Sequence, residues 1–516
     1  MKRVLLTLIA CATGSTLWAQ TAFEAKLAEI GINPTQCTKI EDSSIMIDEP
    51  DCAYANLTDM EGSNTHAVLD FYDNKGNYIQ KNVIVGIQGN SDAIKQSFAI
   101  ELCEDEWLGE ETTDLTIGNW PAQDEFHLKA FYEDGLRGIA EVAYQLYGQI
   151  SGRENCYPKA FPVMLYRNGD FYGLMAWQLK KHRDNMGLDK KNSTHIWLDG
   201  KLTNKNLWQG DIDWTDFEVR NPKDLFTMDG SDYDGDEPAE LMDQTSAAFI
   251  EGKGKHERCA EAKQHIVELS TYCTLLSQAE AANSSSVYMC SKIKDMFDVE
   301  QLINYRIFSL VTNNYDGFGK NWQWFTYDAQ QWTVAPYDCQ LTFGYNDATD
   351  DAGNRTYTLW EAKQGSKKYD YKMENTATDG PMQWITTYYA DQLKSRYAEL
   401  RNQGIISAEN ITKLLEAWVN RVGESNYATE FAAWADCPFQ VGVNESLDRL
   451  FTWVNERIAL EDSFLGYDDP SAIQHIQHPT DVIKDVYSLT GNHSAAQRGL
   501  VIIRYTDGSN RKVYVK

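Results

Sequence analysis

Three polar residues near the middle of the chain have side chains and a spacing suited to chemistry on phosphate. Asp316 and Asn321 are separated by four residues, and Asp338 follows after two aromatic, strand-like segments. A carboxylate can orient an attacking hydroxyl group, while oxygen atoms of an asparagine and a second carboxylate can hold the divalent ions that neutralise phosphates. On this interpretation Asp316 is the candidate catalytic residue, and Asn321 and Asp338 are the candidate metal ligands.

The order D-x-x-x-x-N is that of the catalytic loop of protein kinases, in which a second metal-binding aspartate lies on the next hairpin. The pattern is short, and a chain rich in Asp and Asn contains it about once or twice by chance. In a structural interpretation, Asp316 forms a turn before Gly317 and Asp338 is a cap after Pro336. Spacing alone favours this second interpretation, whereas the surrounding elements support the first.

The loop lies between a predicted helix and a predicted pair of strands. Residues 298–314 repeat apolar side chains at helical spacing, and residues 322–328 and 332–338 alternate like strands that would carry Asp338 back toward the loop. The remaining pattern predicts hairpins over 66–90 and 161–181, strands over 95–103 and 124–132, and helices over 137–150, 397–422 and 445–465. This mixture predicts an α+β fold.

Residues 200–298 form a predicted insertion with its own helices, the clearest of which covers 259–278. The acidic run at 228–237 has the composition of a calcium loop, but its carboxylates do not fall at the spacing of an EF-hand. A solvated acidic loop is therefore the preferred interpretation, with a calcium site as the alternative.

The first residues are typical of an export signal. A basic start, an apolar run and a small residue at Ala19 predict a signal peptide over 1–19 with cleavage before Gln20. The alternative is lipoprotein processing at Cys11, after a shorter apolar run. No other stretch is long and apolar enough for a transmembrane segment, so we expect a protein that is secreted, periplasmic or on the outer cell surface.

Charge and cysteine content exclude several classes of protein. The net charge of -29 becomes -31 when Lys2 and Arg3 are removed with the signal, which disfavours nucleic acids and anionic membranes as partners. The nine cysteines after the predicted signal peptide contain no C-x-x-C pair, which argues against a zinc ribbon or a thioredoxin-type centre. Export permits a Cys37–Cys52 disulfide or one between two of Cys259, Cys273 and Cys290, and buried free thiols are the equal alternative.

Four blocks of the sequence occur in the order found in the CotH kinase family, which is named for the spore coat protein H. The chain resembles that family from about Ala53 to Gly466, and the matching blocks are VGIQGNSDAIKQSFAIEL, YRNGDFYGLMAWQL, NNYDGFGKNWQWF and VAPYDCQLTFG. The resemblance implies an atypical protein-kinase-like fold that transfers phosphate from ATP, with Mg²⁺ or Mn²⁺, to serine residues of secreted proteins. It also implies that Asp316 is the catalytic aspartate, that Asn321 and Asp338 bind metal, and that Lys95 contacts ATP phosphates.

The chain departs from the family pattern at three positions near the implied nucleotide site. Gln88 stands where the family usually has an arginine, Gln178 where it has a glutamate, and Gln340 where it has a second aspartate. Each exchange removes a charge, and a neutral amide is a poorer ligand for a hard divalent ion than a carboxylate. We therefore expect weaker metal binding, unless Asp328 or another acid substitutes.

Two further clusters have both a functional and a structural interpretation. The basic run at 180–185 would form a lip for an acidic substrate or for phosphates, or only the solvated end of a hairpin. A set of aromatic residues would stack on a base or sugar, but their alternate spacing favours core positions. These aromatic residues are Trp322, Trp324, Phe325, Trp332 and Tyr337.

The end of the chain predicts three or four short strands and resembles the sorting and attachment domains of Bacteroidetes secreted proteins. A small β-sandwich cap is the structural alternative. The sequence thus divides into a signal peptide (1–19), an N-terminal segment (20–52), the kinase-like domain with its insertion (53–466), a linker (467–481) and a small all-β C-terminal domain (482–516).

Three functions follow from these patterns. The leading hypothesis is a secreted atypical kinase that transfers phosphate from ATP to protein serine or threonine. The second is a pseudokinase that keeps the fold and binds a nucleotide, a glycan or a partner protein at the cell surface. The third is a structural surface protein without a small-molecule site. The scarcity of ATP outside the cell weighs against the first, and the expected partner is a protein acceptor or a cell-surface component.

Overall fold

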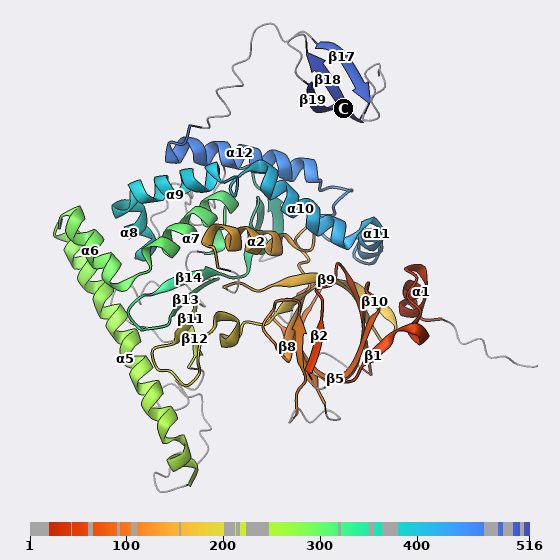
Figure 1. Cartoon of the computed structure of the whole chain (residues 1–516), viewed down its shortest axis with the longest axis horizontal. Helices are drawn as coiled ribbons and strands as arrows, with labels where there is room; N and C mark the ends of the chain where they lie inside the picture. The colour runs from red at the N-terminus through yellow and green to blue at the C-terminus, as the bar shows by residue number, and fades with distance from the viewer. Residues whose placement is uncertain are drawn as a thin grey trace, which may run out of the picture. The chain divides into compact units, whose positions relative to one another are not determined.

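The computed structural model describes residues 20–42, 44–59, 65–89, 93–104, 111–153, 156–200, 212, 217–222, 247–317, 321–349, 355–363, 380–468, 483–488, 499–505 and 510–515. The chain divides into two compact units, Met1–Glu461 and Asp462–Lys516. The first unit combines a β-barrel, a smaller sheet and a layer of helices, and the second contains three strands (Figure 1). The predicted α+β composition is confirmed.

Seven strands of the first unit close into a barrel, to which β1 adds at one edge. The order is β1-β5-β4-β3-β9-β10-β8-β6, and β5 also pairs with β6, so the sheet closes on itself (Figure 1). Neighbouring strands are antiparallel except in the β1–β5 and β3–β9 pairs. The strands are β1 (Thr38–Ile40), β3 (Ala53–Thr58), β4 (Thr65–Asp73), β5 (Asn77–Gln88), β6 (Ser97–Cys103), β8 (Glu125–Lys129), β9 (Ala160–Arg167) and β10 (Asp170–Leu179).

The other strands of the first unit form a four-stranded antiparallel sheet and two strand pairs. The sheet has the order β12-β11-β13-β14, and the pairs are β2–β7 and β15–β16. Their bounds are β2 (Ser44–Ile47), β7 (Asp114–Ile117), β11 (Ile196–Gly200), β12 (Phe217–Asn221), β13 (Trp322–Thr326), β14 (Thr333–Pro336), β15 (Tyr345–Thr349) and β16 (Arg355–Leu359). The second unit contains β17 (Ile483–Ser488), β18 (Gly499–Tyr505) and β19 (Asn510–Val515), which pair antiparallel.

Helices pack beside the barrel and the four-stranded sheet (Figure 1). They are α1 (Ala22–Glu29), α2 (Ile139–Ser151), α5 (Ala247–Ala281), α6 (Ser286–Met296), α7 (Val299–Thr312), α8 (Pro381–Tyr388), α9 (Ala390–Asn402), α10 (Ala408–Val422), α11 (Glu424–Ala433) and α12 (Leu447–Leu465). α2 contacts both α7 and α10, so it links the barrel strand before it to the helical layer.

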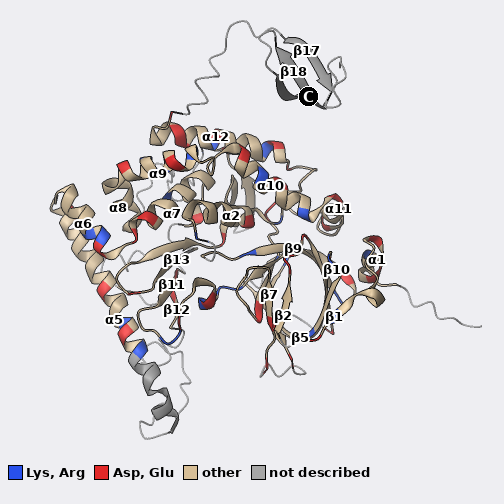
Figure 2. Cartoon of the chain, in the orientation of Figure 1, with Lys and Arg blue, Asp and Glu red and all other residues tan. Residues whose placement is uncertain are grey.

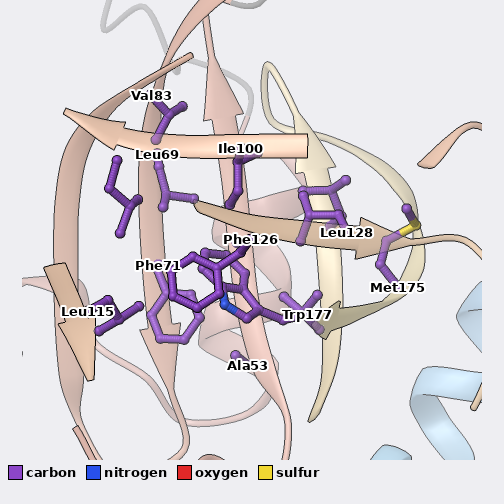
Figure 3. Packing of buried hydrophobic residues seen from close by; sticks show 14 of the residues in the cluster. Ala53, Leu69, Phe71, Val83, Ile100, Leu115, Phe126, Leu128, Met175 and Trp177 are labelled. Atoms are coloured by element: carbon purple, nitrogen blue, oxygen red, sulfur yellow. The ribbon is translucent and has the colours of Figure 1, made fainter. Parts of the chain in front are cut away.

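Alternate residues of the barrel strands point inward and form one apolar core. Phe71, Phe126 and Trp177 pack together there, and the Trp177 ring centroid lies 5.3 Å from those of both phenylalanines (Figure 3). Each such buried side chain contributes on the order of 2 kcal/mol to stability. Because side chains alternate along a strand, the burial of Phe126 in this core leaves His127 and Lys129 on the outer face of β8.

Helix α2 begins at a capped turn. The Asp134 carboxylate accepts hydrogen bonds from the backbone N–H groups of Gly138 (2.6 Å) and Ile139 (2.5 Å), which satisfies the open end of the helix. At the other end Gly152 has φ 68°, a left-handed conformation that glycine adopts at little cost. Both ends of the helix are thus fixed by local sequence.

The helices and strands predicted around the site are present, and one predicted helix is split into two. Both hairpins and the helices expected at 137–150, 259–278, 298–314 and 445–465 are confirmed. The run at 397–422 instead forms two helices, because Gly404 turns the chain with φ 73° and Ser407 caps the start of α10. The acidic run at 228–237 lies outside the described residues.

The structure decides between disulfides and free thiols, which the sequence leaves open. All nine cysteines after Cys11 are free thiols, and seven of them are buried. Burial raises the pKa of Cys52 to about 12, so this thiol stays protonated and unreactive. The structure therefore contains buried thiols in place of the candidate disulfides.

The surface of the helical layer is rich in charge. Acidic residues recur along α9, α10 and α12 (Figure 2). Among the described helices, none combines the length and the apolar character that a membrane span requires.

Candidate functional site

The loop that carries Asp316 is held by α7. This helix ends at Asn313, whose left-handed backbone (φ 54°) turns the chain into the 3₁₀ turn η3 (Tyr315–Gly317). The Tyr305 hydroxyl group donates a hydrogen bond to the carbonyl oxygen of Gly317 over 2.7 Å. Asp316 therefore lies at a fixed position beyond the end of α7, and it is only half-buried.

Asn321 joins Asp316 to the β13–β14 hairpin. Its side-chain amide donates a hydrogen bond to the Asp316 carboxylate over 2.6 Å. Its backbone carbonyl oxygen accepts a hydrogen bond from the N–H group of Tyr337 over 2.9 Å. This backbone contact closes the open end of the hairpin, so Asp338, the residue after Tyr337, lies beside Asn321. The structure thus brings together the three residues that the D-x-x-x-x-N spacing singles out.

The two predicted metal ligands share an uncommon backbone conformation. φ is 59° at Asn321 and 52° at Asp338, a left-handed region that Asn and Asp tolerate better than most residues. Such conformations cluster at functional sites, where surrounding contacts hold them in place. Asp338 precedes the 3₁₀ turn η4 (Cys339–Leu341), but its side chain makes no capping hydrogen bond. Its carboxylate is therefore not used as the cap that the structural interpretation requires.

The Cys339 thiol lies near three carboxylates. Burial raises the pKa of Cys339 well above its ordinary value, and the charges of Asp338, Glu141 and Asp316 raise it further. All three carboxylates thus act on the Cys339 thiol through their charge. Asp316 and Asp338 are both partly exposed, so their oxygen atoms can reach a ligand.

The residues present fit a divalent ion that arrives with phosphate. Within the described ranges, no group of three His, Cys, Asp or Glu side chains is arranged to hold a metal ion. A kinase-type site does not require one, because Mg²⁺ usually binds one or two protein groups and completes its shell with phosphate oxygens and water. Asn321 and Asp338 supply two neighbouring oxygen-bearing groups of this kind.

Glu141, in the first turn of α2, belongs to the same region although the sequence patterns do not single it out. Its carboxylate accepts a hydrogen bond from the Gln178 side chain over 2.9 Å, and both residues are almost fully buried. Burial raises the pKa of Glu141 to about 8. A glutamate at position 178 would face a second carboxylate, which is unfavourable unless a proton or a cation lies between them. The signal available in the sequence is a single acid within the helix at 139–151.

Glu141 also lines a cavity of about 530 Å³ between α2 and the start of β9. The lining of this cavity includes Gln145 and Tyr157 but none of the three loop residues. The cavity therefore gives the Glu141 region an approach that does not involve the loop residues. We place the candidate site at the loop, because hydrogen bonds join Asn321 to both Asp316 and Tyr337, the neighbour of Asp338.

Two of the exchanged glutamines lie on the outer face of the barrel. Gln178 is paired with His127 across β10 and β8, and paired residues of antiparallel strands point to the same face. Gln88 is paired with Ser97 across β5 and β6, and Ser97 lies level with Lys129 in the β6–β8 register. Gln88 and Gln178 therefore face the same side of the barrel as His127 and Lys129.

Lys95 has other partners than the loop residues. Its ammonium group donates hydrogen bonds to the Glu430 carboxylate and to the Leu174 carbonyl oxygen, each over 2.7 Å. Arg137 binds the same carboxylate over 2.8 Å, and the side chains of Lys95 and Glu430 are both fully buried. Lys95 thus belongs to a buried ion-pair cluster that joins α11 to the barrel, and its contact with ATP phosphates stays a prediction.

Gln340, the third exchanged glutamine, and Asp328, the acid expected to substitute for it, lie at different places along the β13–β14 hairpin. Gln340 is in η4, two residues after Asp338, and is half-buried. The Asp328 carboxylate instead accepts hydrogen bonds from the N–H groups of Gln330 (2.9 Å) and Gln331 (2.8 Å), in the turn between β13 and β14. Because this turn is the other end of the hairpin from Asn321, Asp328 does not replace the missing charge.

The two remaining clusters are packed parts of the structure. In the basic run at 180–185, Lys180 binds Glu125 and Lys181 binds Asp199, so these side chains are paired. A simply solvated end therefore does not describe these two lysines, and the role of a basic lip stays a prediction. The side chain of Trp322 lies outside the described residues, and the other predicted core aromatics are buried: Trp324, Phe325, Trp332 and Tyr337.

A closed barrel beside a helical layer, with a polar loop at the end of α7, defines an α+β protein with a candidate site for phosphoryl transfer. The model of the CotH kinase protein family matches residues 84–460, well over half of the chain, and the chain belongs to this family. The match includes every predicted site residue from Gln88 to Gln340. No curated protein matches the sequence.

Proposed function

We propose that this chain is an exported protein kinase of the CotH type that transfers phosphate from ATP to serine or threonine side chains of a protein acceptor. The observation that supports this best is the grouping of Asp316, Asn321 and Asp338 at one end of the β13–β14 hairpin. Membership in the CotH kinase family supports the same reaction class.

Each loop residue has a role in this proposal. Asp316 orients the acceptor hydroxyl group and accepts its proton, while Asn321 holds the Asp316 carboxylate through the 2.6 Å hydrogen bond. Asn321 and Asp338 would bind Mg²⁺ or Mn²⁺, which would neutralise charge on the phosphates of ATP. Gln88 and Gln178 would face the nucleotide as neutral groups on the barrel.

A pseudokinase is the second candidate, and the glutamines favour it. The Gln178 side chain is engaged with Glu141 over 2.9 Å, and Gln340 carries an amide close to Asp338 where the family pattern has a carboxylate. With fewer acidic groups the site attracts a divalent ion less strongly. The chain would then bind a nucleotide or another ligand without efficient transfer and act as a surface binding protein.

The place of action is also part of the proposal. The sequence features of residues 1–19 support export, and the chain would act in the periplasm, on the outer surface or outside the cell. Residues 482–516 would serve as a sorting or attachment segment, an assignment supported by their likeness to such segments and by the three antiparallel strands β17, β18 and β19.

A phosphorylation assay tests the proposal. The chain without residues 1–19 is incubated with labelled ATP, Mn²⁺ and a set of generic acceptor proteins. We expect label on the chain itself or on an acceptor, and a loss of about 100-fold or more in Asp316→Ala. Asp170→Ala, at the exposed start of β10, is the control and should transfer label like the wild type.

The outcomes separate the two candidates. Transfer that persists in Asp316→Ala would contradict the role of this residue. Binding of ATP by the wild type without transfer would favour the pseudokinase. If the wild type neither binds ATP nor transfers phosphate, both candidates are wrong.

A further inference from the structure

A cluster of basic side chains surrounds His127 on the outer face of the barrel. Burial lowers the pKa of His127 well below its ordinary value, and four cations lower it further: Lys129, Lys180, Lys181 and Arg220. Because charge effects weaken with distance, these four cations form one positive cluster. His127 stays neutral within it.

Within the described part of the chain, Lys129 is the one cation of this cluster without a counter-charge. The other three bind carboxylates: Lys180 binds Glu125, Lys181 binds Asp199, and Arg220 binds both Asp199 and Glu218. No carboxylate of the described residues pairs with Lys129, although this lysine is only 9% exposed. A cation in a mostly buried residue with no opposite charge beside it favours the approach of an anion. A bound anion would supply the counter-charge that the described residues do not.

The position of Lys129 indicates which anion fits. Its ammonium group lies 5.6 Å from the ring centroid of Tyr337, and the Lys181 ammonium group lies 3.9 Å from the same centroid. Tyr337 immediately precedes Asp338, and its backbone N–H binds Asn321. The ring of Tyr337 therefore lies near the two lysines, and its backbone lies next to the two proposed metal ligands, Asn321 and Asp338.

We propose that Lys129, with Lys181 beside it, binds the phosphate chain of a nucleoside triphosphate. A polyphosphate is long enough to contact a divalent ion on one side of Tyr337 and the lysines on the other. This assigns to Lys129 the contact that the sequence predicts for Lys95. The inference rests on the proposed function for the identity of ATP, whereas the binding of a polyphosphate does not depend on phosphate transfer.

Calorimetric titration of the chain with tripolyphosphate and with ATP, each with Mn²⁺, measures this contact. We expect Lys129→Met to weaken binding of both ligands by about 10- to 100-fold, the effect of losing one charge-assisted hydrogen bond. Lys180→Met removes the same charge from the same cluster, but its ammonium group is already paired with Glu125 and partly exposed. It should change affinity by less than about threefold.

Two further measurements distinguish ligand binding from a structural role. Lys129→Met replaces an unpaired charge with an apolar side chain of similar length, so the melting temperature of the ligand-free protein should stay the same or rise. A structural lysine would give the opposite change. Lys129→Arg keeps the charge and should bind tripolyphosphate more tightly than Lys129→Met does.

The results decide this inference independently of the kinase reaction. Weaker tripolyphosphate binding in Lys129→Met, at unchanged melting temperature, supports it even if the wild type transfers no phosphate. Equal binding by wild type and Lys129→Met overturns it, as does the absence of tripolyphosphate and ATP binding by the wild type. Loss of both affinity and thermal stability in Lys129→Met also overturns it, because the lysine would then be structural.

Discussion

The side-chain amide of Asn321 donates a hydrogen bond of 2.6 Å to the carboxylate of Asp316. One contact thus links the residue that would orient the acceptor hydroxyl group to a residue that would hold the divalent ion. Asn321 also accepts a backbone hydrogen bond of 2.9 Å from Tyr337, which places Asp338 next to the same contact. Asn321 is therefore at the centre of the candidate site.

We expect Asn321→Ala to remove a metal ligand and to release the Asp316 carboxylate at the same time. Mn²⁺-dependent binding of ATP should weaken by at least about tenfold, which is the usual scale for damage to a metal site. Titration of ATP affinity at several Mn²⁺ concentrations measures the change. Asn455→Ala, at an exposed position of α12, should behave like the wild type. An unchanged Mn²⁺ dependence in Asn321→Ala would refute its assignment as a ligand.

Gln340→Asp should strengthen the binding of the divalent ion. The side chain lies in η4, two residues after Asp338, where a carboxylate would add charge that the amide lacks. Without metal the two acids repel each other, so the melting temperature should fall by a few degrees. With Mn²⁺ and ATP it should rise by more than in the wild type, because the ligand binds the folded state. If Mn²⁺ raises both melting temperatures equally, position 340 does not face the ion.

Lys95→Met should destabilise the fold and leave nucleotide binding intact. The Lys95 ammonium group is 2.7 Å from the Glu430 carboxylate, and neither side chain is exposed. Breaking a buried ion pair costs about 3–5 kcal/mol, and the remaining contact with Arg137 favours the lower end of this range. Urea unfolding measures the loss, and Lys413→Met on the exposed face of α10 should change the free energy of unfolding by less than about 0.5 kcal/mol. A Lys95→Met variant of normal stability that fails to bind ATP would restore the phosphate role of Lys95.

The secondary structure near the site could be predicted because it depends on local patterns. The alternation in β8 and the apolar spacing in α7 are visible in the sequence. Closure of the barrel could not be predicted, since the β5–β6 and β3–β9 pairs depend on which strands meet in space. The need for glycine at position 138 could not be predicted either. A Cβ atom there would lie 1.9 Å from the side chain of Trp418, which is distant in the sequence, so only glycine fits.

The site could be predicted only where its residues share one loop and one hairpin. Asp316, Asn321 and Asp338 meet that condition. Lys129 and Glu141 do not, because they stand out through burial and through the charges around them, which the sequence does not display. Lys95 shows the converse: its place in a matching block suggested a phosphate contact, whereas packing gave it the carboxylate of α11 as a partner.

Glu141 couples folding to proton uptake. Burial raises its pKa from the ordinary 4.5 to about 8 in the folded chain. For a group whose folded-state pKa is raised, the stabilising contribution is complete below the unfolded pKa and is lost as pH rises through the folded pKa. The contribution of Glu141 is therefore complete below pH 4.5 and lost by about pH 8, with a slope of up to about 1.4 kcal/mol per pH unit.

Glu141→Gln should remove this dependence on pH, because the amide is neutral throughout. Gln178 can still pair with it, since the Gln178 carbonyl oxygen has no partner among the described residues and can accept the new N–H. We expect the difference in melting temperature, variant minus wild type, to become more positive from pH 5 to pH 9. Glu416→Gln, at an exposed position of α10, should show no such trend. Parallel stability curves for Glu141→Gln and wild type would mean that Glu141 ionises in the folded chain as it does in the unfolded one, and that burial at the start of α2 does not control its charge.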